Sequence, residues 1–387
     1  MNYDFDKLVN RRKEASVKWN CGENELPMWV ADMDFEVAPC ITETMKERIS
    51  HPCFGYSEMP ERWAKSYVDF WKDMFGTDLK EEALLFSLGI IPSLSTSIRA
   101  FSNPGDEVIL LTPVYNIFNH SVENSGRVAV PVSLINENER YSIDFEALEK
   151  ALSSPKAKIL VLCNPHNPVG RIWSKEELSR IALSCKKHNV LVISDEVHGP
   201  ISYGGDTYVP YVSSCEEARM NSITLIAPTK AFNVAGVQTS ACYVENKAIR
   251  DKLAFALNAD EVMEGNFLSY EVAISCFDEG REWLNQMNVY VHENYLYVKD
   301  FLKNQLPKAN LAPLEATYLI WVDLSSYEED DVSFCSSLRK ETGLWITPGS
   351  TYGKEGKGHV RINLACPRSR VIDGMNRLYF YCKKLDC

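Results

Sequence analysis

Three polar residues in the middle of the chain carry the side chains that a covalent cofactor site needs. Lys230 follows an apolar run at 223–227, and Asp195 closes an equally apolar run at 190–194. Asn167 lies in the string Asn-Pro-His-Asn-Pro-Val-Gly at 164–170. An amine can attach pyridoxal phosphate covalently, a carboxylate can pair with its protonated pyridine nitrogen, and an amide can hydrogen-bond its phenolic oxygen. The three residue types together therefore predict a pyridoxal 5′-phosphate site.

Each of these residues also has an ordinary structural interpretation. Lysines are mostly solvated surface charges, Asn-Pro strings form turns, and an Asp after a strand often caps a helix. The shared context favours chemistry, because all three residues follow β-branched or aliphatic runs. Ligands of open α/β sheets bind at the carboxyl ends of the strands, so we expect the three side chains to lie along one edge of one sheet.

The elements that must position them form an alternating pattern from about residue 82 to residue 245. Ser174-Lys175-Glu176-Glu177 is a capping box, and the apolar residues that follow it recur at helical spacing. Alternation of short apolar runs with amphipathic stretches predicts an α/β fold, with a mainly parallel sheet and crossover helices. The seven predicted strands are 84–88, 108–111, 128–132, 159–163, 190–194, 223–227 and 241–244.

After residue 244 the pattern changes to long helical stretches with polar faces. Helices are predicted at 247–258, 267–304 and 368–384. Strands of a smaller sheet are predicted at 318–324 and 360–364. The C-terminal part is therefore expected to be a separate α+β unit.

The composition limits the classes of partner. The chain has 387 residues, 41 Lys and Arg against 53 Asp and Glu, and a net charge of −12. Such a charge argues against a nucleic-acid or anionic membrane surface, because like charges repel. No apolar run approaches the roughly 18 residues of a membrane span, and the start of the chain lacks a signal-peptide pattern. We therefore expect a cytoplasmic protein that binds neither nucleic acid nor membrane.

The cysteines and histidines indicate neither disulfides nor a metal. The twelve cysteines are scattered without a short Cys-x-x-Cys pair, and the seven histidines form no cluster with metal-ligand spacing. A chain with a core of this size does not need disulfides. Reduced and mostly buried thiols are the expectation, and no metal is predicted.

Four strings, in this order along the chain, resemble a known family. They are Asn-Pro-His-Asn-Pro-Val-Gly-Arg at 164–171, Ser-Asp-Glu-Val-His at 194–198, Ala-Pro-Thr-Lys-Ala-Phe-Asn-Val-Ala-Gly at 227–236 and His-Val-Arg-Ile-Asn-Leu-Ala at 359–365. The chain resembles fold-type I pyridoxal-phosphate enzymes of aminotransferase class I/II. Within that superfamily it is most similar to the bacterial cystathionine β-lyase and carbon-sulfur lyase branch, on the string at 28–35 and on Gln238.

The resemblance implies a domain organisation. It implies a large pyridoxal-phosphate-binding domain at 46–290 and a small domain that combines the N-terminal segment 1–45 with the C-terminal part 291–387. It also implies a homodimer with shared active sites, in which Tyr56 reaches the phosphate bound by the neighbouring subunit.

The resemblance also assigns roles to residues of the site. Lys230 and Asp195 act on the cofactor, Tyr115 stacks on its ring, and Arg361 clamps the substrate carboxylate, as a guanidinium can through two hydrogen bonds. His198 is placed near the phenolic oxygen, although a structural histidine is the competing interpretation. The implied catalytic residues are Lys230, Asp195 and Tyr115, the cofactor contacts add Asn167, His198, Gly89, Ile90, Ile91, Thr229 and Tyr56, and the substrate contacts are Arg361, Ala31 and Asn167.

Two positions depart from the common transaminase pattern. A hydroxyl residue that contacts the phosphate is replaced by Ala227, and a phosphate-binding arginine is replaced by Gln238. The phosphate is then left to Thr229, to Tyr56 and to the backbone at 87–93, where Gly89 is expected to permit a tight turn and Pro92 suits the first helical turn.

The resulting functional prediction is elimination at the Cβ–S bond of cystathionine or of other cysteine S-conjugates, which gives pyruvate, ammonia and a thiol. An aminotransferase shares the early steps and stays open as the alternative. A regulatory protein that keeps the cofactor and contacts a transcription factor is a remoter one. The intact set of Lys230, Asp195 and Arg361 argues against a purely non-catalytic role.

Overall fold

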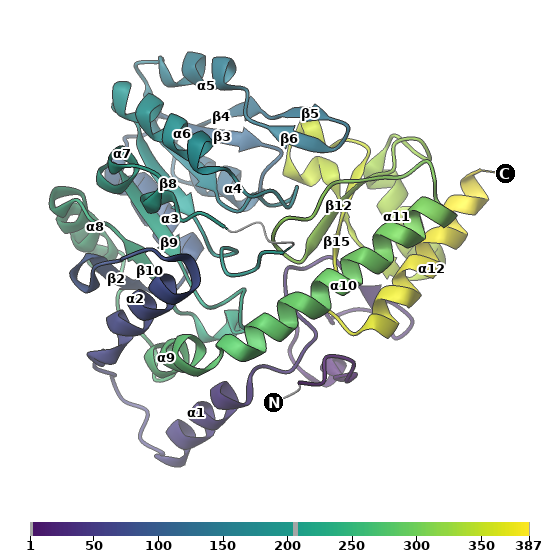
Figure 1. Ribbon diagram of the computed structural model, residues 1–387, viewed down its shortest axis with the longest axis horizontal. Coiled ribbons are helices and arrows are strands. Elements are labelled where there is room, and N and C mark those ends of the chain that lie inside the picture. The colour runs from purple at the N-terminus through teal and green to yellow at the C-terminus, as the bar shows by residue number, and fades with distance from the viewer. Residues whose placement is uncertain (1–2, 204–207, 387) are drawn as a thin grey trace.

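A seven-stranded sheet forms the centre of the larger part of the molecule (Figure 1). The computed structural model describes residues 3–203 and 208–386. The strand order is β2-β10-β9-β8-β7-β3-β4. Neighbours from β9 to β4 are parallel, whereas β10 runs antiparallel to both β9 and β2. The strands are β2 (Leu84–Ser87), β3 (Glu107–Thr112), β4 (Val128–Ser133), β7 (Ala157–Cys163), β8 (Leu191–Asp195), β9 (Ser222–Ile226) and β10 (Ser240–Tyr243).

Helices cover both faces of this sheet, as the alternating sequence pattern predicts. One face packs against α3 (Ile90–Phe101), α4 (Ile117–Asn124) and α8 (Lys247–Ala259). The other packs against α5 (Phe145–Leu152), α6 (Lys175–Lys187) and α7 (Glu216–Met220). Strands β8 and β9 are buried along their whole length, which explains their continuous apolar runs. The predicted α/β fold with a mainly parallel sheet is confirmed.

Helix α6 begins where the capping box predicts. The Ser174 side chain accepts a hydrogen bond from the Glu177 backbone N–H, and the Glu177 carboxylate accepts one from the Ser174 N–H. Arg171 forms an ion pair with the same carboxylate at 2.9 Å. The start of α6 is therefore fixed beside the loop that carries Asn167.

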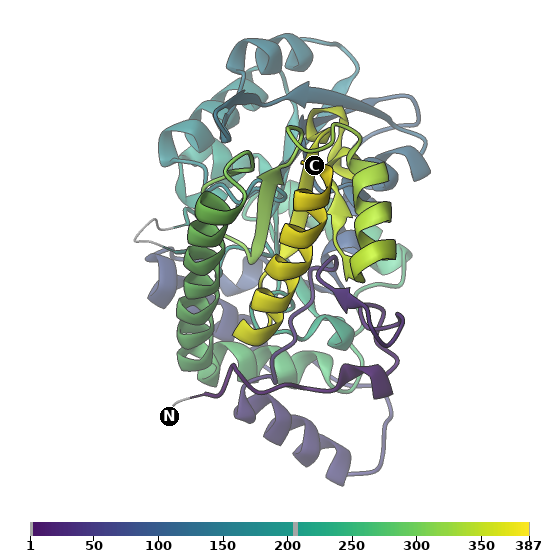
Figure 2. The same ribbon diagram turned by 90° about the vertical axis from the view of Figure 1, so that its right-hand side faces the viewer.

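A second, antiparallel sheet lies beside the first and is covered by the long helices of the C-terminal part (Figure 2). Its order is β11-β12-β15-β14. These strands are β11 (Asn310–Leu311), β12 (Leu319–Asp323), β14 (Thr347–Pro348) and β15 (His359–Asn363), and the helices are α10 (Arg281–Gln305), α11 (Asp331–Thr342) and α12 (Arg368–Leu385).

The stretch at 267–304 contains two helices, not the single one predicted. Helix α9 (Ser269–Glu279) ends at Gly280, where α10 begins in a new direction. A Cβ atom at Gly280 would lie 2.5 Å from the Cys276 carbonyl oxygen and 2.7 Å from the Phe232 ring. The helical spacing of apolar residues continues across this bend, so the sequence pattern did not reveal where one helix ends and the next begins.

The N-terminal segment runs along the C-terminal helices before the chain enters the first sheet (Figure 2). Its short strand β1 (Leu26–Pro27) pairs in parallel with β13 (Leu344–Trp345), and α1 (Pro39–Ser50) and α2 (Arg62–Phe75) follow and pack against α9. A hairpin of β5 (Ile135–Glu137) and β6 (Arg140–Ser142) leaves the first sheet toward the second one. Short 3-10 turns lie at 11–13, 81–83, 211–213, 235–237, 349–352 and 354–356. The domain boundaries at residues 45 and 290 stay predictions.

Candidate active site

The three residues that open the sequence argument line one cavity at the carboxyl edge of the parallel strands. Asp195 is the last residue of β8, Asn167 follows β7, and Lys230 follows β9. The Asn164 backbone N–H donates to the Asp195 carbonyl at 2.9 Å, which continues the pairing of β7 and β8 past their ends. The cavity has a volume of about 350 Å³, and its lining also includes Ala31, Gly89, Ile90, Ile91, Tyr115, Cys163, His198, Thr229 and Gln238.

Lys230 is held in this lining by a hydrogen bond to the N-terminal segment. Its Nζ donates to the Ala31 carbonyl oxygen at 2.7 Å. Burial lowers the pKa of the Lys230 amine, the Asp32 carboxylate partly offsets that change, and Arg361 lowers the pKa further. A lysine with a lowered pKa carries more of the neutral, nucleophilic amine at a given pH.

Asp195 is a buried carboxylate with few donors around it. Only 6% of the residue is exposed, and Oδ1 accepts a hydrogen bond from the Val197 backbone N–H at 3.1 Å. Burial raises the pKa of Asp195 to about 6, although the Val197 N–H and the nearby Lys230 both act in the opposite direction. A buried carboxylate in this state favours a cationic partner, because an opposite charge restores the solvation that burial removed.

His198 lies in the cavity wall as a neutral imidazole. Burial lowers its pKa to about 3, and the cations Lys230 and Arg361 lower it further. Its ring packs edge-on against Tyr318 at 5.8 Å, and its Nδ1 has no hydrogen-bond partner among the described residues. The histidine therefore has an unused polar atom in a buried position, which a purely structural histidine would satisfy within the protein.

Arg361 connects the second sheet to the Asn167 loop. It lies in β15, opposite Trp321 of β12 and Thr347 of β14. Its Nη1 donates to Asn167 Oδ1 at 3.1 Å and its Nη2 donates to the Trp29 carbonyl oxygen at 3.0 Å. The residue is buried, and its Nε has no partner among the described residues. Arg361 does not itself line the cavity, but it contacts a residue that does.

The first turn of α3 closes one end of the cavity. Gly89 precedes the helix, and Leu88, Ile90, Ile91 and Pro92 also line the space. The first N–H groups of a helix have no acceptor within it and carry a partial positive charge, so this end suits an anion. The prediction that Gly89 forms a tight turn is wrong: its φ of 174° is extended backbone, which any residue adopts.

The 227–238 loop contributes the remaining polar groups of the cavity. Thr229 and Gln238 line it, whereas Ala227 is buried at the end of β9. Gln238 has a left-handed backbone, with φ of 59°. The cavity lining contains one cation, Lys230, so the departure at Gln238 leaves this end without an arginine.

Tyr56 is a predicted site residue that does not line the cavity. It lies in an irregular segment between α1 and α2, and its side chain is fully exposed. Its predicted role on a neighbouring subunit stays a prediction.

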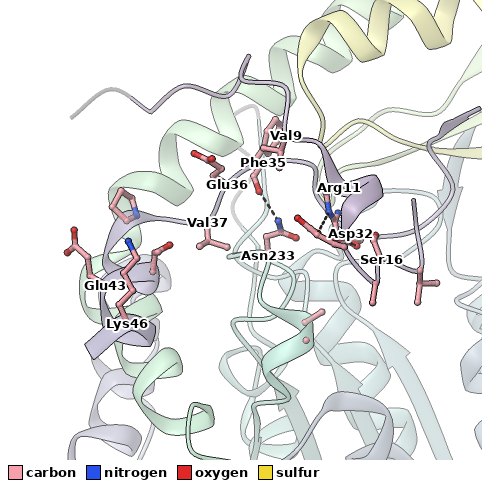
Figure 3. A pocket seen from close by; sticks show the side chains of 17 residues that line it. Val9, Arg11, Ser16, Asp32, Phe35, Glu36, Val37, Glu43, Lys46 and Asn233 are labelled. Carbon is pink, nitrogen blue, oxygen red and sulfur yellow. Dashed lines mark hydrogen bonds and ion pairs between the residues drawn. The ribbon is translucent and has the colours of Figure 1, made fainter. Parts of the chain in front are cut away.

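Sequence reasoning missed Asn233, which ties the Lys230 loop to the N-terminal segment. Its side chain accepts from the Met33 N–H at 3.2 Å. It also donates to the Phe35 carbonyl at 3.0 Å (Figure 3). Its backbone is left-handed, with φ of 58°, a conformation that Asn tolerates better than most residues. The only hint in the sequence was the presence of an Asn three residues after Lys230.

A larger surface cavity, with a volume of about 810 Å³, is lined in part by Asn233 (Figure 3). Its wall contains Arg11 and Asp32, which form a two-bond ion pair with both distances at 3.0 Å. The Arg11 and Asp32 side chains are therefore already paired with each other. Ala235 is the one residue that this cavity shares with the lining around Lys230. The smaller cavity is therefore the candidate active site.

Other kinds of site were also sought in the described part of the chain. Residues 3–203 and 208–386 contain no group of three or more His, Cys, Asp or Glu side chains arranged to hold a metal ion. In the same ranges, no helix is long and apolar enough to cross a membrane. The cysteines of these ranges are free thiols, as predicted, and Cys387 lies outside the described residues.

Comparison with known proteins gives consistent matches over nearly the whole length. The family model described as aminotransferase class I and II matches residues 23–377. The chain is 36% identical to cystathionine beta-lyase PatB of Bacillus subtilis, over 97% of this chain and 98% of that protein. The structure of cystalysin from Treponema denticola, which contains a pyridoxal 5′-phosphate cofactor, has a TM-score of 0.96 at 31% identity and covers 100% of both chains. A PLP-bound putative aminotransferase from Clostridium difficile has a TM-score of 0.96 at 34% identity, over 98% of this chain and 100% of the other.

Proposed function

Because the chain belongs to the aminotransferase class I and II family, we propose that it binds pyridoxal 5′-phosphate beside Lys230 and eliminates thiols from cysteine S-conjugates such as L-cystathionine. The observation that carries this proposal is the convergence of Lys230, Asp195 and Asn167 on one cavity, with Arg361 bonded to Asn167. The full-length similarity to a cystathionine beta-lyase supports the choice of reaction.

The residues of the cavity fit the cofactor at each of its polar positions. Asp195 offers a buried carboxylate for the pyridine nitrogen, and the unpaired Nδ1 of His198 offers a hydrogen bond within the same wall. Asn167 uses Oδ1 toward Arg361, which leaves its amide N–H groups to donate to the ring oxygen. The start of α3, with Thr229 and Gln238, offers neutral donors to the phosphate.

In the proposed mechanism the substrate carboxylate binds Arg361. The guanidinium is already oriented by Asn167 and by the Trp29 carbonyl, so little freedom is lost when the carboxylate binds. Its unpaired Nε is a further donor in a buried position. This contact fixes the amino-acid end of the substrate next to Lys230.

Lys230 then removes the proton from the substrate Cα. The bound cofactor supplies an acceptor for the electron pair that this proton leaves behind. Asp195 and Tyr115 both line the cavity: Asp195 would hold the proton on the pyridine nitrogen, and Tyr115 would pack against the cofactor ring. Loss of the proton from Cα and cleavage of the Cβ–S bond, with uptake of one water, convert the S-conjugate into a thiol, pyruvate and ammonium.

We also propose that the enzyme is a homodimer in which Tyr56 contacts the phosphate bound by the second copy. Full exposure of this tyrosine supports the assignment, because it leaves the whole side chain accessible to a second copy. The cytoplasmic location stays a prediction from the sequence.

The test of the reaction is turnover of L-cystathionine without an added 2-oxo acid. Elimination returns the enzyme to its starting state, so pyruvate, ammonia and a thiol should form over many turnovers. A transaminase would stop after one half-reaction per site and resume only when a 2-oxo acid is supplied. A strict requirement for the 2-oxo acid with L-cystathionine, L-cystine and S-alkyl-cysteines would refute the lyase assignment.

Transamination is the second candidate, because a solved structure 34% identical to this chain is described as a putative aminotransferase. The residues around Lys230 serve both reactions up to loss of the Cα proton. The same assay decides between them, since it separates continuous turnover from a single half-reaction.

A further inference from the structure

The hairpin that leaves the first sheet reaches the strand that carries Arg361 (Figure 1). Strands β5 and β6 pair as far as Glu137 and Arg140, which leaves Asn138 and Glu139 as a two-residue turn. Both turn residues have a left-handed backbone, with φ of 54° and 63°. Asn-Gly is the usual sequence of such a turn, because glycine adopts positive φ without strain. A glutamate at the second position is unfavourable for the backbone, so its side chain is the feature to explain.

The Glu139 carboxylate contacts His359, a residue of the same strand as Arg361. Glu139 Oε2 lies 3.1 Å from His359 Nε2, and the Lys357 carbonyl oxygen lies 3.1 Å from Nδ1. These two atoms are acceptors, so only an imidazolium, with a proton on each nitrogen, donates to both. Glu139 and His359 are each 7% exposed, so water does not freely replace a lost partner. The geometry therefore favours the protonated ring.

Other titratable groups near His359 come from the elements packed around it. Together with those of its own strand and of the hairpin turn, they are Glu139, Tyr141 of β6, Asp323 of β12, Asp331 of α11, Tyr352 of the 349–352 turn and Arg361. Burial lowers the pKa of His359, but Glu139 and Asp323 raise it, and the net change is upward. The anions around the ring therefore outweigh its burial.

Aromatic rings connect His359 to Arg361 on one face of the second sheet. The two residues are two positions apart in β15, so their side chains lie on the same face. The Trp321 ring stacks on His359 at 5.0 Å and meets the Tyr352 ring at 5.7 Å and 81°. The Arg361 guanidinium lies over Tyr352, 4.7 Å from the ring centre. Tyr141 accepts from the Trp321 indole N–H at 2.9 Å, so the hairpin contacts the first two rings of this series.

We propose that His359 is a positioning residue for the substrate carboxylate: as an imidazolium bound to Glu139, it fixes the aromatic rings against which Arg361 is aligned. Loss of the proton, or of the Glu139 carboxylate, loosens these rings, and Arg361 then binds a carboxylate less tightly. The inference rests on the proposed role of Arg361 as the carboxylate clamp. His359 does not line the cavity around Lys230, so it acts through Arg361.

The test measures how the holoenzyme binds two small ligands. 3-(Methylthio)propanoate has the carboxylate and thioether of a substrate without the amine, and 2-(methylthio)ethylamine has the amine without the carboxylate. Dissociation constants are measured from the change in cofactor absorbance. Glu139→Gln removes the charge that holds the imidazolium. Glu149→Gln is the matched control, because Glu149 of α5 forms another ion pair with a histidine, His188 after α6, at 2.8 Å.

At pH 6, Glu139→Gln should weaken binding of the propanoate about fivefold and leave the amine within about twofold, because only the propanoate needs Arg361. At pH 9 the wild-type imidazole has also lost its proton, so the ratio of the two dissociation constants, variant to wild type, should fall toward one. This ratio cancels the titration of groups that both proteins share. His359→Gln removes the imidazolium itself and should show the same selective loss at pH 6, whereas Glu149→Gln should change neither ligand.

The inference would be overturned by an equal weakening of both ligands, or by no weakening of either in Glu139→Gln and His359→Gln. A propanoate ratio that stays the same at pH 6 and pH 9 would also overturn it. If the wild type did not bind the propanoate, the clamp role of Arg361 would be refuted as well. The proposed β-elimination fails on a different result, which is absence of pyruvate when the wild type is given L-cystathionine.

Discussion

Replacement of Asp195 by Asn tests the electrostatic core of the proposed mechanism. Asp195 is 6% exposed, and among the described residues its carboxylate accepts one hydrogen bond, from the Val197 N–H at 3.1 Å. Asn keeps the side-chain oxygen that accepts this bond, so the turn after β8 should survive. The substitution removes the negative charge, and with it the ion pair to the protonated pyridine nitrogen.

The expected loss follows from the burial of Asp195. Two unit charges about 4 Å apart, at an effective dielectric of about 20, interact with about 4 kcal/mol. Each 1.36 kcal/mol is a factor of about ten in rate, so turnover should fall by roughly a thousandfold. The assay is steady-state release of pyruvate from L-cystathionine at saturating pyridoxal phosphate, with cofactor binding followed separately by absorbance.

Glu196→Gln is the control for loss of a buried carboxyl group at this position in the sheet. Glu196 is buried, does not line the cavity, and accepts hydrogen bonds from Asn164, Ser194, the Tyr211 N–H and Tyr208. Burial raises its pKa to about 7, so loss of its negative charge is far less costly than for an ordinary carboxylate. The Gln variant should therefore turn over within a few-fold of the wild type. If the Asp195 variant did the same, Asp195 would be a structural cap and the electrostatic argument would be refuted.

Three further predictions follow from the contacts of other residues. Lys230→Ala should abolish turnover, and borohydride treatment should fix the cofactor to Lys230 in the wild type, with peptide mapping as the check; label on another lysine would contradict the assignment. Burial alone would lower the pKa of His359, but its ion pair with Glu139 at 3.1 Å outweighs burial and raises the pKa above the unfolded value of about 6.5. That stabilisation is complete below pH 6.5 and is lost as the pH rises through the folded pKa. Glu139→Gln should therefore lower the free energy of unfolding by about 2 kcal/mol at pH 6 and by less at pH 9, measured by denaturant unfolding. An equal loss at both pH values would contradict the ion pair. Tyr56→Phe should weaken pyridoxal phosphate binding about tenfold without lowering the melting temperature, as titration and calorimetry would show; unchanged affinity would argue against contact with the second copy's phosphate.

The strands and their polar ends could be predicted because they depend on local sequence. Each of the seven predicted strands of the large sheet is present to within one or two residues. The central strands β7, β8 and β9 are buried on both faces and must be apolar throughout, whereas the edge strand β4 is largely exposed. Convergence of Lys230, Asp195 and Asn167 then follows from the geometry of parallel strands, whose carboxyl ends meet at one edge. The direction of β10 could not be predicted in this way, because an apolar run does not indicate which way its strand runs in the sheet. In the structure β10 is antiparallel to both of its neighbours.

Contacts between residues far apart in the chain could not be predicted from the sequence. The Arg361–Asn167 bond joins residues 194 positions apart, and the Lys230–Ala31 bond joins residues 199 positions apart. Neither pair has a local pattern that would reveal it. The resemblance to a family placed Arg361 and Ala31 near the substrate, but it did not show that the backbone of the 29–35 segment holds both Lys230 and Arg361.

A buried charge cluster explains how that segment keeps its position. Asp34 is 1% exposed, and its carboxylate contacts Lys18 at 3.0 Å, Arg370 at 3.1 Å and the Trp19 indole N–H at 2.8 Å. Lys18, which is equally buried, also donates to the Asp32 carbonyl at 2.9 Å. Residue type alone would assign Lys18 and Asp34 to the surface, because isolated charges are rarely buried. Here Asp34 is the anion that both Lys18 and Arg370 contact, so its removal would leave the buried Lys18 without its ion-pair partner. None of these charged side chains lines the cavity, so the Ala31 carbonyl that accepts from Lys230 is positioned by charges outside the candidate active site.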